Sequence, residues 1–284
     1  MSDPRLDLRE PSAPPDRRRI WVVKIGGRLC ERAEDRARFA LACAAQSHPI
    51  VVVHGGGDSV SRMQSKLGLE PRFESGRRVT SEEEIEVVEM VLSGTVNAAL
   101  VRALESAGRP AVGITGSDAG FVRCDRIEGL GCVGAPRQVE PRLLHVLLDA
   151  GYTPVVSPVA VDDAGQPLNV NADESAAAIA VALGAARLLF VSDVDGVSVD
   201  EAWQREIEID AIEALIASGA ATGGMIPKLR AARAAVASGV GEVRIAAFDA
   251  ASFERLRGTR LHAPAETSQP GGPSWRETAV GGTS

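Results

Sequence analysis

Residues 20–27 read IWVVKIGG and residues 50–58 read IVVVHGGGD. Each stretch is a short, mostly β-branched run that ends in glycines, as expected of a strand buried on both faces. The predicted strands are Ile20–Ile25, Ile50–Val53, Ala111–Thr115, Thr153–Ser157, Leu188–Ser192 and Val243–Ala246. Longer helical patterns fill the intervals, and this alternation predicts an α/β fold with a mostly parallel sheet covered on both faces.

The clearest helix is predicted for Glu82–Leu104. Ser81 and Glu84 have the spacing of a capping box, and apolar residues then recur at helical intervals. Two stretches, Arg72–Thr80 and Phe121–Gln138, are predicted to be β-hairpins or irregular excursions, because glycines and charges interrupt any period there. Excursions of this kind beside a sheet often cover a substrate.

Composition limits the classes of function. Of the 284 residues, 45% are apolar and only 4% aromatic, which fits an enzyme-like α/β core. The net charge of -7 shows no basic domain for a nucleic-acid backbone. No apolar run approaches the length of a membrane span and no signal peptide is evident, so we expect a cytoplasmic protein. The four cysteines have no metal-ligand spacing and are expected to be reduced, mostly buried thiols.

The chain is predicted to divide into four parts. Residues 1–19 are expected to be a mobile segment, because residues 2–16 carry four prolines and several charges, and residues 263–284 to be a disordered tail. Residues 20–183 are predicted to form an N-terminal lobe and residues 184–262 a C-terminal lobe. This boundary is placed where Gly184 ends a helix.

Four glycine-bearing loops follow strands or open helices: Lys24–Gly27, His54–Asp58, Asp193–Gly196 and Gly223–Lys228. In an open α/β sheet such loops gather at the carboxyl ends of the strands, where ligands bind. Glycine lets phosphate oxygens approach backbone N–H groups, although a single such loop is also an ordinary tight turn. No Walker sequence and no complete dinucleotide fingerprint occurs, which disfavours a P-loop NTPase or a Rossmann dehydrogenase.

Two lysines lie next to these loops and are candidates for binding a phosphoryl group from opposite sides. Lys24 interrupts an apolar strand just before two glycines, where a charge is costly unless a partner or ligand meets it. Lys228 enters a late helix. Phosphoryl transfer needs mainly positioning and cationic stabilisation, so these lysines are predicted to be catalytic.

Polar residues alternate along residues 168–174. In an extended backbone Asn169, Asn171 and Asp173 would point to one side, so that Asp173 pairs with both lysines and Asn169 reaches a substrate. The alternative is an Asx-type cap on the helix that begins near Asp173, and the two are compatible. Arg78 is a candidate for bidentate binding of a carboxylate, slightly preferred over its neighbour Arg77.

Nine strings occur in order between about Val22 and Leu261: VVKIGG, VVVHGGGD, GRRVT, MVLSGTVN, AVGITGSDAG, GYTPVVSPVA, LNVNADESAAAIA, SDVDGV and GGMIPK. This ordered set resembles the amino acid kinase superfamily and, within it, the N-acetylglutamate kinases of arginine biosynthesis. The resemblance implies a three-layer α/β/α sandwich with a mostly parallel central sheet. It also implies an N-terminal lobe that binds the acyl amino acid and dimerises, and a C-terminal lobe that binds ATP with Mg2+.

The resemblance also assigns roles to single residues. Lys24 and Lys228 would stabilise the transferring phosphoryl group and Asp173 would organise them. Backbone groups at Gly27, Gly55 and Gly56 would assist, while Arg78 and Asn169 would hold the substrate's α-carboxylate. The residues assigned to the nucleotide are Gly26, Ser192, Asp193, Asp195, Gly196, Gly224 and Met225. No residue is assigned as a metal ligand, because a turn preference explains the aspartates as well.

The chain departs from the family pattern at three places. Ala98 stands where a lysine is common, residues 131–135 lack the usual histidine and glutamate, and Ala119 splits an expected Asp-Gly pair. These departures leave two alternatives open: a kinase of the same fold that acts on aminoadipate or glutamate borne by a carrier protein, and a nucleotide-binding regulator without turnover. The short, Pro-broken lead-in predicts an arginine-insensitive homodimer rather than a ring of dimers.

Overall fold

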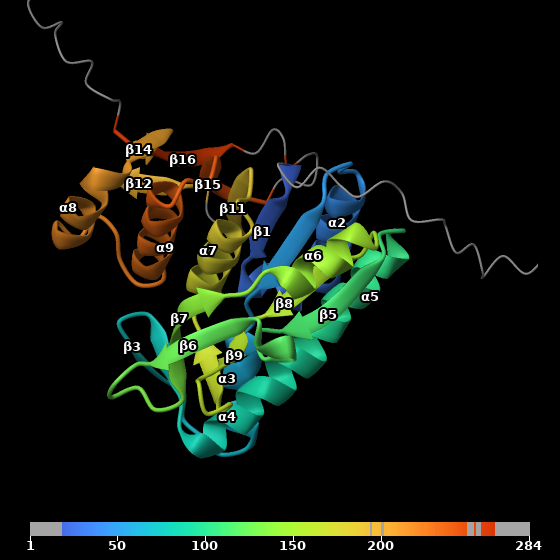
Figure 1. The fold of residues 1–284 in the computed structure, drawn as a ribbon. Coiled ribbons are helices and arrows are strands. Elements are labelled where there is room, and N and C mark those ends of the chain that lie inside the picture. The colour runs from blue at the N-terminus through green and yellow to red at the C-terminus, as the bar shows by residue number, and fades with distance from the viewer. Residues whose placement is uncertain (1–18, 194, 200–201, 249–252, 254–256, 265–284) are drawn as a thin grey trace, which may run out of the picture.

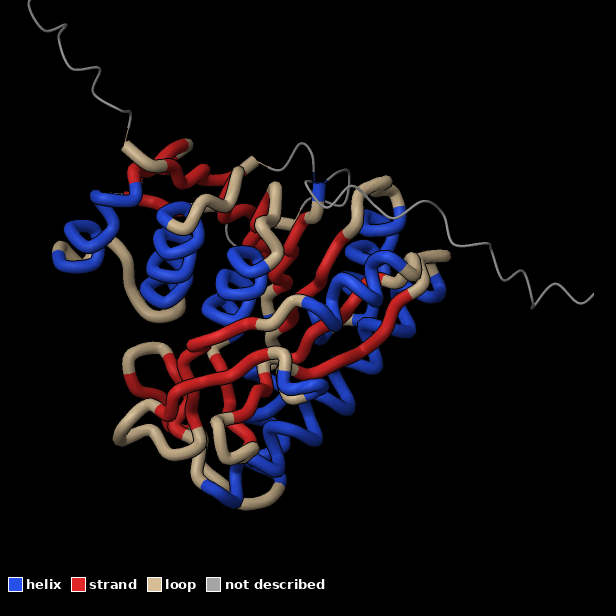
Figure 2. The backbone as a smooth tube through the Cα atoms, viewed as in Figure 1, coloured by secondary structure: helices blue, strands red, loops and turns tan. Residues whose placement is uncertain are grey.

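The computed structural model describes residues 19–193, 195–199, 202–248, 253 and 257–264. An eight-stranded sheet forms the middle layer (Figures 1 and 2). Its strands lie in the order β14 (Glu206–Glu208), β16 (Gly258–His262), β15 (Glu242–Ala247), β11 (Arg187–Ser192), β1 (Trp21–Ile25), β2 (Ile50–His54), β8 (Thr153–Ser157) and β5 (Ala111–Thr115). All neighbours pair in parallel except β15 and β16, so the predicted mostly parallel sheet is confirmed.

All six predicted strands are present, with bounds within one residue of the prediction. The strand β14, at one edge of the sheet, and its neighbour β16 were not predicted. Their apolar residues alternate with charged ones over only a few positions, a pattern that does not stand out from loops in the sequence.

Helices cover both faces of the sheet (Figure 1). One face carries α6 (Arg142–Asp149), α7 (Ala172–Ala182) and α9 (Met225–Ala237), and the other carries α2 (Ala33–Ala44) and α5 (Asn97–Ser106). Two short helices, α1 (Gly27–Glu31) and α3 (Gly57–Lys66), follow the first two glycine loops. The helix α8 (Ile212–Ala217) precedes α9. The molecule is therefore the expected α/β/α sandwich.

The predicted long helix is present but is not uniform. It begins with α4 (Glu82–Glu89), whose Ser81 and Glu84 form the predicted capping box, passes through a π-helical segment η2 (Met90–Val96), and continues as α5. By length and composition alone, residues 82–106 are apolar enough to cross a membrane, whereas the sequence analysis expected no apolar run of that length. A core helix passes the same test, and this one packs against β5, β8 and α2.

Smaller strands lie beyond the carboxyl ends of the central strands. Both predicted excursions are hairpins: β3 (Arg72–Glu74) with β4 (Arg77–Val79), and β6 (Val122–Arg126) with β7 (Val133–Val139). Together with β9 (Val159–Val161) and β10 (Pro167–Val170), the second hairpin closes a small barrel. The remaining elements are β12 (Val197–Val199), β13 (Ala202–Gln204), and the short 3-10 turns η3 (Asp118–Gly120) and η4 (Ile209–Ala211).

The core lies between the sheet and its helices and consists mainly of Val, Ile, Leu and Ala. All four cysteines are buried and free, as predicted. Most of the expected mobile segment and disordered tail lies outside the described residues. The division into lobes at residue 183 stays a prediction, since the central sheet runs on through both parts.

Candidate active site

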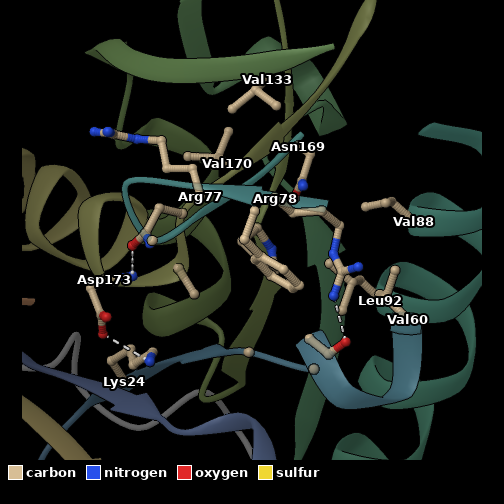
Figure 3. A pocket seen from close by; sticks show the side chains of 18 residues that line it. Lys24, Val60, Arg77, Arg78, Val88, Leu92, Val133, Asn169, Val170 and Asp173 are labelled. Carbon is tan, nitrogen blue, oxygen red and sulfur yellow. Dashed lines mark hydrogen bonds and ion pairs between the residues drawn. The ribbon is translucent and has the colours of Figure 1, made fainter. Parts of the chain in front are cut away.

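Asp173 joins two lysines in the candidate site, and Figure 3 shows its carboxylate paired with Lys24 at one side of the pocket. Its Oδ1 accepts hydrogen bonds from Lys24 Nζ at 2.8 Å and from Lys228 Nζ at 2.9 Å. Lys24 comes from β1, Asp173 from the first turn of α7 and Lys228 from the first turn of α9. The three side chains are almost completely buried. Three segments far apart in the sequence therefore converge on one carboxylate.

Electrostatics keep this centre charged. Burial alone would raise the pKa of the Asp173 carboxyl, but the ammonium groups of Lys24 and Lys228 outweigh it and lower that pKa to about 2. Burial and the charge of Lys24 lower the pKa of Lys228 to about 8, although Asp173 opposes the shift. The Lys228 ammonium also lies 5.3 Å from the centre of the Phe190 ring. One carboxylate thus neutralises only one of two ammonium groups, which leaves a buried positive site suited to a phosphate.

The backbone around Asp173 differs from the predicted comb. Asn169 lies on β10, but the strand ends at Val170 and Asp173 is helical, so one extended segment does not present all three side chains. Asn171 is the helix cap: its Oδ1 accepts from the backbone N–H groups of Asp173 at 2.9 Å and Glu174 at 3.2 Å. The capping alternative is therefore correct for Asn171, and the cap fixes the turn that carries Asp173.

The first two glycine loops lie directly against each other. Gly26 N donates to Val191 O at 2.8 Å and Gly55 N to Ile25 O at 3.1 Å, so both loops continue the strand ladder. A Cβ added at Gly27 would lie 3.2 Å from Gly56 N, and one at Gly55 would lie 3.2 Å from Gly27 N. Only glycines allow this backbone approach, and an anion can then reach the N–H groups unobstructed.

A cavity of about 180 Å³ adjoins this centre, between the glycine loops and the β3–β4 hairpin (Figure 3). Its polar lining includes Lys24, Arg78, Asn169, Asn171 and Asp173. Apolar walls come from Val60, Phe73, Val88, Leu92, Val133 and Val170. Such a cavity suits a small molecule with a carboxylate at one end and an apolar body.

Arg78 is held rigidly at the cavity wall. Its Nη2 donates to Gly57 O and to Ser61 Oγ, each at 2.7 Å, and its guanidinium lies 4.6 Å from the centre of the Phe73 ring. Burial lowers its pKa from the usual value, although it stays a strong base. Asn169 Nδ2 donates to Thr80 Oγ1 at 3.1 Å, and Thr80 Oγ1 donates to Arg78 O, which links the two predicted substrate residues.

Two buried side chains that support Arg78 were not found from the sequence. Gln64 Oε1 accepts from Arg78 Nη1, and Gln64 Nε2 donates to Glu84 Oε1 at 2.8 Å. Glu84 is the residue of the capping box. The available signal was Gln64 on the inner face of a helix, where a polar residue needs a partner.

His54 and Asn97 form a second supporting pair. Asn97 Nδ2 donates to Val155 O at 2.8 Å and contacts His54 Nε2 at 3.1 Å, while His54 Nδ1 lies 2.9 Å from Gly55 O. Burial lowers the pKa of His54 to about 4, so the ring is neutral at physiological pH. The pair therefore orients the Gly55 peptide by hydrogen bonding.

Several of the residues predicted to bind nucleotide are more exposed to solvent than those around Asp173. Asp193 is exposed and accepts from Arg28 Nη1 at 2.5 Å, and Asp195 is exposed as well. Gly224 is the cap residue of α9, followed by Met225, and a Cβ at Gly224 would meet nothing within 4 Å. Ser192 Oγ is buried without a hydrogen-bond partner. Gly196 approaches Thr259 and Trp203 closely, whereas Val194 in the same loop lies outside the described residues.

A profile of the amino acid kinase family matches residues 19–247. The chain belongs to this family. As a family member it is 44% identical over 228 residues to the acetylglutamate kinase of Geobacillus kaustophilus, which covers 79% of this chain and 88% of that enzyme. It is 46% identical over 231 residues to the acetylglutamate kinase of Solibacter usitatus, covering 79% and 90%.

A solved relative agrees with the fold of this amino acid kinase. The crystal structure of smu.665 from Streptococcus mutans UA159 superposes with a TM-score of 0.75 at 28% identity, covering 86% of this chain and 98% of that one. The expected family and fold are therefore confirmed. The chain is a phosphotransferase that uses ATP and a small-molecule acceptor.

Proposed function

We propose that this chain transfers the γ-phosphoryl group of ATP to the side-chain carboxylate of N-acetyl-L-glutamate, in arginine biosynthesis. One observation carries the proposal. Lys24 and Lys228, far apart in the chain, meet on the buried Asp173 beside a small cavity lined by Arg78 and Asn169.

The transfer forms one bond and breaks one. A carboxylate oxygen of the acceptor bonds to the γ-phosphorus, and the bond from that phosphorus to the β,γ-bridging oxygen breaks, its electron pair leaving with ADP. Negative charge then spreads over the phosphoryl and bridging oxygens. Lys24 and Lys228 stabilise that charge from fixed positions, because Asp173 holds both ammonium groups before the reaction begins.

The acceptor needs no general base. A glutamate side chain has a pKa of about 4.3, so its carboxylate is already ionised at neutral pH. Arg78 and Asn169 hold the α-carboxylate, which directs the side-chain carboxylate toward the Gly27 and Gly55–Gly56 loops. The neutral His54 takes no proton and acts only on the position of the Gly55 peptide.

The residues on the nucleotide side fit a triphosphate. The unpartnered Ser192 hydroxyl, the open backbone at Gly224 and the amino end of α9 all offer hydrogen bonds to phosphate oxygens. Within the described residues no three His, Cys, Asp or Glu side chains are placed to hold a metal ion. Mg2+ would therefore bind mainly through the phosphates of ATP, whose charge it neutralises.

A coupled ADP-release assay tests the proposal. The purified chain, MgATP and free N-acetyl-L-glutamate should give turnover, and Lys228→Ala, run in parallel, should be about a hundredfold slower or more. Turnover that requires a carrier protein bearing aminoadipate or glutamate would overturn the acceptor. Nucleotide binding without turnover on either acceptor would make the chain a regulator.

We further propose a homodimer that arginine does not inhibit. The four prolines among residues 2–16 support this at the level of sequence, because proline is disfavoured inside a helix. Sedimentation should give twice the chain mass. A hexamer, or strong inhibition by millimolar arginine, would contradict the proposal.

A further inference from the structure

The β3–β4 hairpin covers the acceptor cavity, yet it is a small element. Its strands pair as Arg72 with Val79, Phe73 with Arg78 and Glu74 with Arg77. The turn places Ser75 at φ 49° and Gly76 at φ 79°, the left-handed pair typical of a two-residue hairpin. A two-stranded ribbon of this size is not stable alone, so contacts outside the hairpin must set its position.

One such contact lies at the tip. A Cβ added at Gly76 would lie 3.3 Å from Pro227 Cγ and 3.4 Å from Gly223 O. The tip therefore packs against the loop and helix start that carry Lys228. A side chain larger than glycine would press on this loop and would also be strained at a positive φ.

A second contact is an ion pair from the next residue. Arg77 Nη2 donates to Glu174 Oε1, and the two side chains are 28% and 17% exposed. Glu174 follows Asp173 in the first turn of α7. Arg77 and Arg78 thus act in opposite directions from neighbouring positions: Arg78 faces the glycine loops, and Arg77 reaches toward α7 (Figure 3).

We propose that Arg77 and Glu174 are positioning residues for the transfer, and that their ion pair, with Gly76 packed on Gly223 and Pro227, forms a clasp that holds the hairpin closed over the acceptor. The clasp ties the element carrying Arg78 to the two segments carrying Asp173 and Lys228. Arg78, whose own partners lie on α3, is then also held in register with Asp173 and Lys228 from the α7 and α9 side. The acceptor's identity, but not the clasp itself, rests on the proposed function.

The clasp adds little to the stability of the fold. Burial raises the pKa of Glu174 despite the opposing effect of Arg77, so the ionised carboxylate is not strongly favoured in the folded protein. Replacement by glutamine removes the charge and keeps the shape. Glu174→Gln should therefore fold normally while losing the ion pair of the clasp.

Kinetics of Glu174→Gln test the positioning role. The KM for N-acetyl-L-glutamate should rise about three- to tenfold while the KM for ATP stays unchanged, as expected for loss of one partly buried ion pair. Arg77→Glu should do the same or worse, and the double variant Arg77→Glu with Glu174→Arg should recover most of the loss. Glu213→Gln, which breaks the exposed pair with Arg230, is the matched control and should change neither KM.

Limited trypsin digestion tests the clasp without turnover. Glu174→Gln leaves every trypsin site in place, so faster cleavage after Arg72, Arg77 or Arg78, mapped by mass spectrometry, reports a hairpin released from α7. We expect cleavage there to be about threefold faster or more, because local opening becomes less costly. Unchanged cleavage, or faster cleavage with an unchanged KM for the acceptor, would overturn the proposal. If the wild-type chain failed to phosphorylate N-acetyl-L-glutamate, the proposed function would fall while the cleavage rates would still decide the clasp.

Discussion

The side of the site that we assign to the acceptor and the side that we assign to the nucleotide are built differently. Beside the acceptor cavity, Asp173 is buried and holds two lysines, and the buried Arg78 has partners in Gly57, Ser61 and Gln64. On the nucleotide side Asp193 is 45% exposed and pairs with Arg28, which is 75% exposed. A cation lies beside a carboxylate in both places. The group is buried and fixed at Asp173, whereas the pair at Asp193 is exposed to solvent.

The two sides therefore bind their substrates in different ways. A preorganised, desolvated charge stabilises a transition state strongly, whereas an exposed pair is screened by water. A small acceptor offers few groups to bind, so its site must be rigid. A triphosphate brings its own charges and its metal ion, so open loops suffice.

The largest effect is expected at the buried centre. Lys228→Ala should lower kcat by about two orders of magnitude or more, since losing one preorganised charge removes roughly 3 kcal/mol of transition-state stabilisation. Arg230→Ala, on the same helix but half-exposed, is the control and should be near wild type. A near-normal kcat for Lys228→Ala would show that Lys228 takes no part in the mechanism. It would also show that the buried charge contributes no more to catalysis than the exposed pair.

The second-largest effect is expected for Arg78, on the acceptor side. Arg78→Ala should raise the KM for the amino acid about 10- to 100-fold and spare the KM for ATP, as expected when a charged hydrogen-bonding group is lost from one substrate only. Arg72→Ala, on the exposed partner strand of the same hairpin, should change the KM far less. Equal increases in both KM values would mean that Arg78 acts on the fold rather than on the acceptor.

The pH profile gives a smaller, graded effect. The folded pKa of Lys228, about 8, lies below its unfolded value near 10.5, so the folded chain releases this proton first as pH rises. The free energy of unfolding therefore increases over this pH interval, because the unfolded chain keeps this proton longer. Over the same interval Lys228 loses the ammonium charge that stabilises the transition state. We expect kcat/KM for ATP to fall by up to about tenfold per pH unit above pH 8. Lys228→Arg should be slower but lack this fall, and a flat wild-type profile up to pH 10 would contradict the assignment.

The smallest effect is expected at the exposed pair. Asp193→Asn should change kcat and the KM for ATP by less than about threefold, because an exposed ion pair contributes only about 0 to 1 kcal/mol. Steady-state kinetics with varied ATP measure this. A loss of a hundredfold or more would show that the nucleotide side is as strictly organised as the acceptor side.

Local sequence determined much of this protein. The β-branched runs that end in glycine predicted the strands within one residue, because strands buried on both faces are uniformly apolar. The capping box predicted where the long helix begins. The ordered motifs also pointed to Lys24, Lys228, Asp173, Arg78 and Asn169, since lysine or arginine beside glycine loops is chemically informative without a structure.

Only the tertiary structure decided how these residues meet. The sequence left open whether Asn171 caps the helix or points toward a substrate. It did not show that Gln64 and Glu84 support Arg78, or that His54 orients the Gly55 peptide. It also preferred Arg78 only slightly over Arg77 and gave Arg77 no partner, whereas Arg77 pairs with Glu174 in the first turn of α7. The contacts of Arg78 with Gln64 and of Arg77 with Glu174 join segments whose separation carries no periodic signal. Their partners are set by the packing of whole layers, which is a property of the folded sheet and not of any single stretch of chain.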